Sequence, residues 1–257
     1  MDIKIPYTPR KHQAYLHKKI SENRWNVLVC HRRFGKTVCM INHLIRSALL
    51  SKNKNPRYAY IAPTFKQAKS IAWDYMKQFT AKIPYTKFNE TELRVDLPNG
   101  SRITLLGSEN SDGLRGIYLD GCVIDEYANV NERLFPEIIR PALSDRKGYC
   151  VFIGTPQGMN NNFYELYQHA QGADDWFKYK AKASDTKIVD NEELQKAKEV
   201  MGEKKYLQEF ECDWIANIEG SVYSDVIAKM EDKKQLTRVP YDPSPVSYTH
   251  LTLPTKA

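Results

Sequence analysis

The segment "VCHRRFGKT", residues 29–37, contains a glycine, a lysine and a threonine in the order that ends a phosphate-binding loop. Five positions before that glycine, where the usual motif has another one, this sequence has Cys30. In such loops main-chain N–H groups at a helix N-terminus face a phosphate, the lysine contacts the β- and γ-phosphates, and the hydroxyl binds Mg²⁺. The alternative is a chance Gly-Lys-Thr, which a second motif must exclude. We expect nucleotide contacts from His31, Arg32, Arg33, Phe34, Gly35, Lys36 and Thr37.

The second motif, "GCVIDE", places Asp125 and Glu126 at the end of an apolar run of strand length. The first carboxylate suits the shell of Mg²⁺, directly or through water, and the second suits orienting and deprotonating an attacking water. An exposed Asp-Glu pair in a turn is the alternative, but the four residues before it have the character of a buried strand. The two motifs together predict nucleotide hydrolysis, with Glu126 as the base and Asp125 as a metal ligand beside Thr37.

Two weaker signals accompany these motifs. "FIGTP" ends another apolar run, and the Thr155 hydroxyl there can sense the γ-phosphate and pass the signal on. Gln13 precedes the strand before the loop and can form two hydrogen bonds with an adenine edge, with Tyr7 or His12 stacked on the ring. An ordinary strand-to-loop turn is the alternative for Thr155, and an exposed helical glutamine is the alternative for Gln13.

The two arginines in the loop also need an explanation. An arginine at this place can lie against the γ-phosphate of the same chain, where it stabilises charge in the transition state. Arg32 and Arg33 are the candidates for this role. The alternative is a solvated basic loop.

The elements that position these residues alternate along the chain. We predict a helix from about Lys11, a hairpin around Pro98-Asn99-Gly100 and one or two helices over 191–214. Further strands are predicted over 26–30, 57–64, 121–127, 148–158 and 176–183, and further helices over 36–50, 65–80, 133–145 and 161–170. This order predicts an α/β fold of the P-loop NTPase (RecA/ASCE-like) type. We expect a mostly parallel sheet with helices on both faces, in three α/β/α layers, and ligands at the carboxyl ends of the strands.

The composition indicates a basic protein with a sizeable core. The 257 residues are 42% hydrophobic, with a formal net charge of +7 and a pI of about 9.0, which favours a polyanionic partner such as nucleic acid. The five cysteines form no C-x-x-C pair, so we expect buried, reduced thiols in a cytosolic setting. The apolar runs are of strand length, and we expect neither a signal peptide nor a membrane partner.

Taken in order, these motifs resemble the ATPase domain of the terminase large subunit, the DNA-packaging motor of tailed bacteriophages. The residues that carry the resemblance are Gln13, "HRRFGKT", "APTFKQAK", "LPNGSRITLLGSE", "LRG", "VIDEYANV", "GTPQG" and "FECDW". They cover roughly residues 5–225 and are specific as a set, although each is modest alone. In that family the P-loop commonly lacks the first glycine and carries arginine, as it does here.

The resemblance implies roles for three residues. Arg32 would be an arginine finger acting in cis, and Thr155 would lie in the motif that couples hydrolysis to DNA movement. Arg115 of "LRG" is a candidate finger that reaches the ATP of a neighbouring subunit, with a structural loop arginine as the alternative.

The resemblance also implies cofactors and partners. ATP and Mg²⁺ are expected, together with double-stranded DNA gripped through its phosphates, a portal protein and the small terminase subunit. A homo-oligomeric ring docked on the procapsid in the host cytoplasm is expected, with a monomer when the domain is isolated. The sequence does not choose among the candidate DNA-contacting residues Arg10, Lys11, Lys18, Lys19, Lys52, Lys54 and Arg57.

We expect three parts in the chain: an ATPase domain over 1–220, a linker over 221–242 toward an absent nuclease domain, and a disordered or non-native tail over 243–257. Nuclease activity is not expected, because no acidic cluster follows residue 225. One alternative is a superfamily 2 helicase-like ATPase, which would need a second RecA-like domain. The other is a nucleotide-binding switch or assembly protein with little turnover, against which Glu126 argues.

Overall fold

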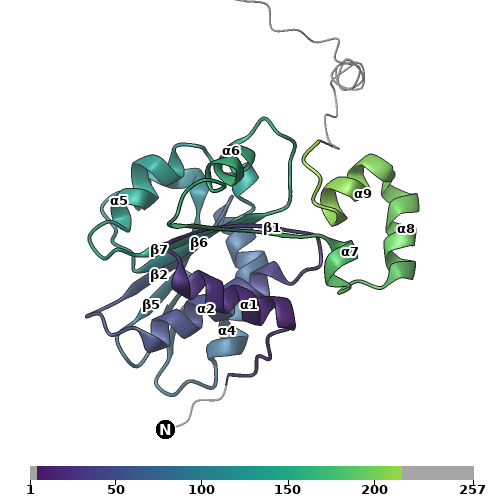
Figure 1. Cartoon of the computed structure of the whole chain (residues 1–257). Helices are drawn as coiled ribbons and strands as arrows, with labels where there is room; N and C mark the ends of the chain where they lie inside the picture. The colour runs from purple at the N-terminus through teal and green to yellow at the C-terminus, as the bar shows by residue number, and fades with distance from the viewer. Residues whose placement is uncertain (1–4, 216–257) are drawn as a thin grey trace, which may run out of the picture. The chain divides into compact units, whose positions relative to one another are not determined.

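The computed structural model describes residues 5–215, so the linker and the tail predicted beyond residue 220 lie outside the described residues. Eight strands form one sheet in the order β3-β4-β5-β2-β6-β7-β1-β8 (Figure 1). The strands are β1 (Trp25–Cys30), β2 (Arg57–Ala62), β3 (Lys87–Asn89), β4 (Arg94–Asp96), β5 (Arg102–Gly107), β6 (Gly121–Asp125), β7 (Tyr149–Gly154) and β8 (Trp176–Ala181).

The six strands from β5 to β8 in this order pair in parallel, whereas β3, β4 and β5 pair in antiparallel fashion. Strands β1 and β6 are buried along their whole length, as expected when helices cover both faces of a parallel sheet. The prediction of a mostly parallel α/β sheet is therefore confirmed.

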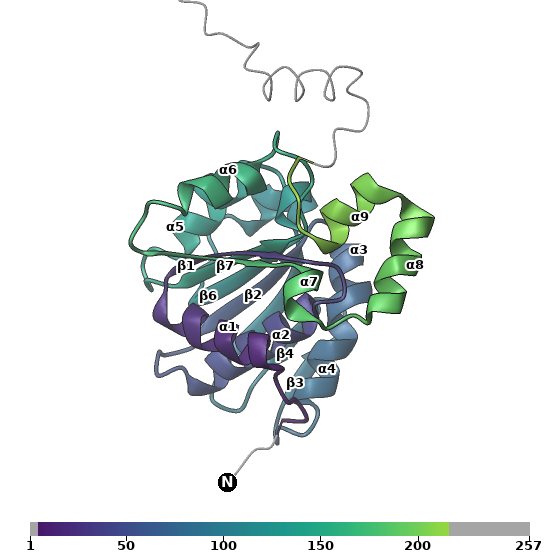
Figure 2. The ribbon, with the colours of Figure 1, turned by 45° about the vertical axis from the view of Figure 1, so that its right-hand side comes forward.

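Helices cover the two faces of the sheet and give the three predicted layers (Figure 2). One hydrophobic core contains Leu16 of α1 and Ile41 of α2, and the other contains Ile139 of η4 and Phe163 of α6. The first layer consists of α1 (Lys11–Glu22), α2 (Lys36–Leu50), α3 (Phe65–Gln67), η1 (Ala68–Trp73) and α4 (Asp74–Thr80). The second contains η2 (Ser108–Leu114), η3 (Tyr127–Asn129), η4 (Leu134–Ile139), α5 (Arg140–Ala142) and α6 (Asn162–His169).

Three more helices follow β8: α7 (Ala183–Thr186), α8 (Asn191–Met201) and α9 (Glu203–Phe210). They pack around a small core of their own, formed by Ala183, Leu194 and Phe210, beside the carboxyl end of β8 (Figures 1 and 2). Gly202, with φ +77°, separates α8 from α9. The sequence predicts one or two helices over 191–214. The structure has two there, and the second ends at Phe210.

Some local features differ from the predictions. The predicted helix 65–80 contains a π-helical segment, η1, between α3 and α4. Strand β3 and helix α7 were not predicted, because three or four residues are too few to show a hydrophobic period. The predicted hairpin is present, with Gly100 at φ +83° in its turn.

Two further expectations concern the cysteines and membrane spans. All five cysteines are buried and free of disulfides, as predicted. Between residues 5 and 215, none of the helices has the length and apolar character needed to cross a bilayer.

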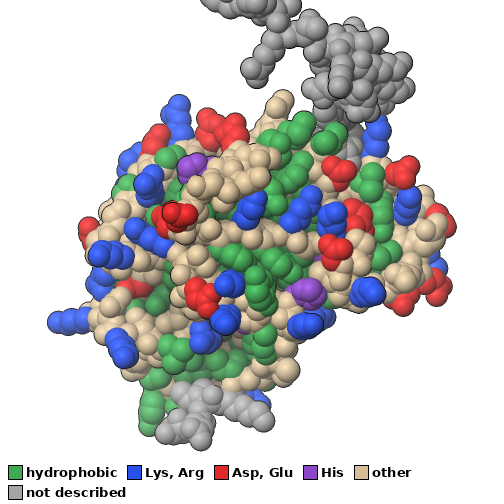
Figure 3. All heavy atoms as spheres, viewed as in Figure 1, with side chains coloured by type: hydrophobic (Ala, Val, Ile, Leu, Met, Phe, Trp, Pro, Cys, Tyr) green, Lys and Arg blue, Asp and Glu red, His purple; other side chains and the backbone are tan. Residues whose placement is uncertain are grey.

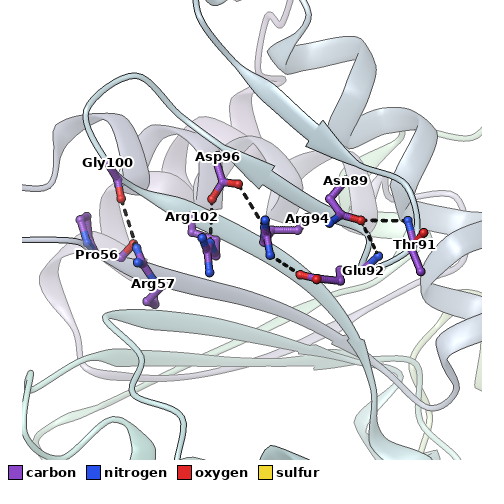
Figure 4. A network of polar contacts seen from close by, with 9 residues as sticks. All are labelled: Pro56, Arg57, Asn89, Thr91, Glu92, Arg94, Asp96, Gly100 and Arg102. Atoms are coloured by element: carbon purple, nitrogen blue, oxygen red, sulfur yellow. Dashed lines mark hydrogen bonds and ion pairs between the residues drawn. The ribbon is translucent and has the colours of Figure 1, made fainter.

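A network of ion pairs lies on the hairpin, and one of them connects β4 with β5 (Figure 4). Asp96 of β4 accepts hydrogen bonds from Arg94 (3.1 Å) and from Arg102 of β5 (2.6 Å), and Arg94 also pairs with Glu92. Arg57, at the start of β2, donates from Nη1 to the carbonyl of Gly100 at 3.1 Å. The arginines at this side of the sheet are thus neutralised or engaged within the chain.

Candidate active site

The predicted phosphate-binding loop connects β1 to α2 at the carboxyl edge of the sheet. Gly35 caps α2 with a left-handed backbone (φ +88°), and Arg33 has φ +69°, whereas Cys30 has no positive φ. The position that lacks the usual glycine therefore has an ordinary backbone. The ammonium of Lys36 donates to the carbonyl of Cys30 at 3.3 Å, which holds this side chain over the loop.

Gln13 supports the loop from α1. Its side chain is buried, donates from Nε2 to the carbonyl of Gly35 at 3.3 Å, and accepts from the main-chain N–H of Arg10 at 2.9 Å. Tyr7 donates to Gln13 at 3.4 Å, and His12 hydrogen-bonds the hydroxyl of Tyr179 at 2.9 Å. Gln13 is thus not the exposed helical glutamine of the alternative, and its contact with adenine stays a prediction.

The two acids lie at the end of β6, directly opposite the loop. Asp125 is buried and accepts hydrogen bonds from the hydroxyl of Tyr60 and, at 3.0 Å, from the main-chain N–H of Glu126. Glu126 has a left-handed backbone (φ +45°), which is uncommon outside glycine and is often found at functional sites. Its Oε1 lies 3.6 Å from Nζ of Lys36. The structure thus brings together the lysine and the two carboxylates that the sequence predicted.

Burial shifts the protonation of both acids. Desolvation raises the pKa of Asp125, and hydrogen bonding from Tyr60 and the charge of Lys36 oppose this rise. Desolvation also raises the pKa of Glu126 against the effect of Lys36, and the nearby charge of Asp125 adds to the rise. A carboxylate with a raised pKa takes up a proton more readily, which suits the predicted role of Glu126 as a base.

Thr155 belongs to the same cluster. It is buried directly after β7, and its main chain hydrogen-bonds the carboxylate of Glu126, which counteracts part of the rise in the pKa of that group. Parallel pairing of β6 with β7 aligns Asp125 with Ile153, so the ends of the two strands meet. The position of Thr155 beside the predicted base supports the prediction that it senses the reaction.

Arg32 points elsewhere in this structure. Its side chain is 62% exposed, and its Nη1 lies 4.0 Å from Oε2 of Glu209 on α9. Its main-chain N–H donates to the carbonyl of Glu209 at 2.8 Å. Arg33 is also exposed. The predicted finger is therefore attached to α9 and is not gathered with Lys36 and Glu126.

Helix α9 was not assigned to the site from the residues alone, yet it contacts two of its loops. Gln208 is fully buried and donates from Nε2 to the carbonyl of Pro156 at 2.5 Å, while Glu209 binds Arg32. His31 of the loop also hydrogen-bonds Thr186 of α7 at 2.8 Å. The only signal for these contacts in the sequence is "FECDW", which begins one residue after Glu209.

Tyr60 was also missed. It lies in the middle of β2. Its hydroxyl lies between Asp125 and Thr37 and hydrogen-bonds both side chains. A tyrosine inside a buried strand needs a partner for its hydroxyl, and this was the available signal.

Arg115 lies away from these groups. It precedes β6 in the connection from η2, and its guanidinium pairs with Glu137 of η4 at 3.5 Å. The residues that form the cluster described above lie at the opposite, carboxyl ends of the strands. The structure does not bring Arg115 to the site of its own chain, and a role toward a neighbouring subunit stays a prediction.

Comparisons with known proteins agree with this geometry. A family model described as terminase large subunit, T4likevirus-type, N-terminal, matches residues 29–227. The terminase large subunit of Thermus phage G20c is 26% identical over 182 residues, which cover 63% of this chain and 36% of that protein. This chain thus spans about a third of the length of that relative.

Solved structures share the fold. The large terminase ATPase domain of Thermus phage P74-26 superposes with a TM-score of 0.69 at 22% identity, over 82% of this chain and 95% of that chain. The large terminase of another thermophilic bacteriophage, in complex with ADP, also gives 0.69 at 17% identity, over 79% of this chain and 53% of that chain. Because the family model covers well over half of the residues, the chain belongs to the T4-like terminase large subunit family, of which it contains the N-terminal domain.

Proposed function

We propose that this chain binds ATP with Mg²⁺, hydrolyses it, and serves as the motor domain that moves double-stranded DNA into a procapsid inside the host cell. The observation that carries the proposal is the 3.6 Å approach of Nζ of Lys36 to Glu126, beside the buried Asp125. A large terminase of similar fold was solved with ADP and with ATP-γ-S, which supports ATP as the nucleotide.

The residues at the loop fit a nucleotide–magnesium complex. Gly35 caps the N-terminus of α2, a helix of 15 residues, so the main-chain N–H groups of the first turn and the helix dipole face the place for the phosphates. Asp125 and the hydroxyl of Thr37 both contact Tyr60 and would hold Mg²⁺ there. Hard oxygen donors of this kind suit Mg²⁺, which when bound neutralises charge on the β- and γ-phosphate oxygens.

In the reaction that we propose, Lys36 moves from Glu126 to the β- and γ-phosphates when ATP enters. Glu126 is then free to orient a water molecule and to accept its proton as the water attacks the γ-phosphorus, whose bond to the β–γ bridging oxygen breaks so that ADP leaves. Arg32 leaves Glu209 and stabilises the charge that develops on the γ-phosphate. Thr155, next to Glu126, passes loss of the γ-phosphate to the rest of the domain.

The proposed partners follow from the family. Motor action requires contacts with DNA phosphates rather than with base edges, because every sequence must pass. A portal protein, the small terminase subunit and a ring of identical subunits on the procapsid complete the proposal.

Neither alternative function gains support. Residues 5–215 form one sheet with one phosphate-binding loop, and a helicase-like enzyme would need a second RecA-like domain. A switch protein without turnover would not need a base, and the acid Glu126 beside Lys36 supports the hydrolase instead.

The first test is the substitution Glu126→Ala. We expect it to abolish phosphate release while ATP binding, measured with a fluorescent ATP analogue, persists, because Lys36 and the loop remain. Glu132→Ala, which removes an exposed carboxylate six residues further on, is the matched control and should keep wild-type turnover. Turnover that survives in Glu126→Ala would show that another group is the base.

A further inference from the structure

We propose that the open edge of the sheet, strand β8, is the surface that holds the phosphate backbone of the DNA. The surface consists of Lys178 and Lys180 of β8 and Lys182 directly after it, and we call it the β8 lysine row. The identity of the polyanion as duplex DNA rests on the proposed function. The existence of a phosphate-binding row rests on the geometry of β8.

Alternation along β8 puts Lys178 and Lys180 on one side, and the extended backbone of Lys182, directly after the strand, continues this alternation. Phe177 and Tyr179 face the other side, where both rings pack against Tyr15 of α1. Two residues of an extended strand span about 6.6 Å, so successive ammonium groups can reach successive phosphates of one DNA strand. Lys and Arg side chains lie along β8 in the middle of the face shown in Figure 3.

The main chain of β8 adds donors to the same edge. Among residues 5–215, β8 pairs only with β1. The carbonyls of Asp175 and Ala181 accept from Trp25 (3.4 Å) and His31 (3.0 Å). In a parallel ladder the residues that bond a given neighbour alternate, so the N–H groups of Lys178 and Lys180 point away from β1. Main-chain N–H groups are common phosphate contacts.

The lysine row is not neutralised within the described part of the chain. Lys178 lies over the ring of Tyr167 at 5.3 Å, and none of the three lysines has a carboxylate within ion-pair distance among residues 5–215. The arginines of β4 and β5 contrast with this, because Asp96 pairs with both Arg94 and Arg102 (Figure 4). Charges left without a partner are available to an external anion.

The lysine row is coupled to the phosphate loop through the sheet. β8 pairs with β1 in register along its whole length, and Cys30 lies opposite Ala181. His31 of the loop binds both the carbonyl of Ala181 and the side chain of Thr186. A displacement of the loop during hydrolysis would therefore reach β8 through hydrogen bonds within the sheet and α7, without passing through a flexible linker.

Lysines on an edge strand can also serve only to prevent pairing with another chain. This interpretation predicts aggregation of a lysine-free variant but no change in DNA affinity. Experiment separates it from our proposal, because a phosphate contact changes the salt dependence of binding.

The experiment measures binding of a fluorescein-labelled DNA duplex by anisotropy at several salt concentrations. The variant replaces the row by glutamine (Lys178→Gln, Lys180→Gln and Lys182→Gln). The matched control replaces three exposed lysines at the β3 side of the sheet, Lys69, Lys82 and Lys87, in the same way. Both variants lose three positive charges, so any effect of net charge on DNA affinity should be the same in both. A difference in DNA affinity between them therefore reports on the lysine row itself.

We expect the row variant to bind at least about tenfold more weakly than the control at low salt, for two unrelated DNA sequences alike. We also expect the slope of log affinity against log salt to fall by about one for each lysine. Equal affinity of the row variant and the control, or an unchanged slope, would overturn the proposal. Lys180→Gln alone, checked for folding by thermal unfolding, repeats the test if the triple variant aggregates.

The proposed function is tested separately, by ATP turnover of the unsubstituted chain without DNA. If the chain binds DNA through β8 but does not hydrolyse ATP, the proposed motor function is contradicted and the proposed DNA-binding surface still holds. If the chain hydrolyses ATP but the lysine-row variant binds DNA as well as the control does, the proposed DNA-binding surface is contradicted and the proposed ATPase function still holds.

Discussion

The left-handed backbone at two residues, Gly35 and Glu126, places the phosphate-binding and acidic groups next to each other. The φ of +88° at Gly35 favours glycine, and a Cβ there would also displace the end of the Gln13 side chain, whose Nε2 would lie 2.9 Å away. Glu126 adopts φ +45° with a side chain, at a cost on the order of 1–2 kcal/mol. The main-chain bond from Glu126 to Asp125 and the contact with Thr155 maintain this conformation at the strand end.

Arg32 is the residue whose predicted role depends most on movement. Replacement by alanine should lower kcat by about 10³-fold or more, because the transition state loses a charge of the arginine-finger kind. ATP affinity should change much less, since Lys36 and the main-chain N–H groups remain. Phosphate-release kinetics and equilibrium binding of a fluorescent ATP analogue measure the two quantities separately.

Arg33→Ala is the control for Arg32→Ala, since it removes the same charge from the next residue of the loop. If kcat falls by less than about tenfold in Arg32→Ala, the arginine finger is instead Arg33, or Arg115 of another subunit. A large loss with Arg33→Ala would select Arg33 directly.

At the scale of elements, α9 joins the two loops that the mechanism needs to coordinate. Gln208 binds the carbonyl of Pro156, next to Thr155, while Glu209 binds Arg32. Both contacts come from adjacent residues of one helix. A shift of α9 therefore changes the phosphate loop and the sensing turn together.

The substitution Gln208→Ala tests this connection. It leaves the buried carbonyl of Pro156 without its donor, so we expect a loss of about 1–3 kcal/mol in the free energy of unfolding, measured in urea. Turnover should fall as well, because the turn that carries Thr155 loses its support. Gln195→Ala on α8 is the control, since that side chain is exposed and hydrogen-bonds Glu199, another residue of the same helix. Equal stability of the two variants would contradict the bridging role of α9.

The sequence predicted those parts of the site that follow long periodic elements. Lys36 and Asp125 could be singled out because β1, α2 and β6 show clear apolar runs before or after them, and the structure brings both residues to the same edge of the sheet. The sequence signals near Glu209 and at Tyr60 could not identify the partners of these residues, since the partners depend on how distant elements pack. The same reason applies to Arg32, whose side chain direction is set by a helix 177 residues further along the chain.

At the scale of the whole molecule, a pair of histidines lies between α1 and α2, with His43 buried and His17 half-buried. His17 and His43 stack at 5.3 Å between ring centroids, and their Nδ1 atoms lie 3.1 Å apart. Tyr7 contacts His17 at 3.0 Å and Arg46 lies nearby. Burial lowers the pKa of His17 to about 4 and that of His43 to about 3, and the charge of Arg46 adds to both shifts.

This pair should make the molecule lose stability in acid. Below the ordinary histidine pKa of about 6.5 the unfolded chain binds protons that the folded chain does not, so the free energy of unfolding falls as pH falls toward 4. The raised pKa values of Asp125 and Glu126 act in the opposite direction, because the folded chain holds protons there that the unfolded chain releases. The two effects overlap in this range, so only a histidine substitution separates them.

His43→Gln removes one of these groups. It should reduce the slope of the free energy of unfolding against pH, on the acid side, by up to about 1.4 kcal/mol per pH unit, the value for one proton. The measurement is urea unfolding at several pH values between about 4.5 and 7, in which the slope against pH, rather than the absolute stability, is compared. His169→Gln, at an exposed position on α6, should leave the slope as in the wild type. An unchanged slope in His43→Gln would show that His43 gains no proton on unfolding, and that the slope on the acid side has its origin in other groups.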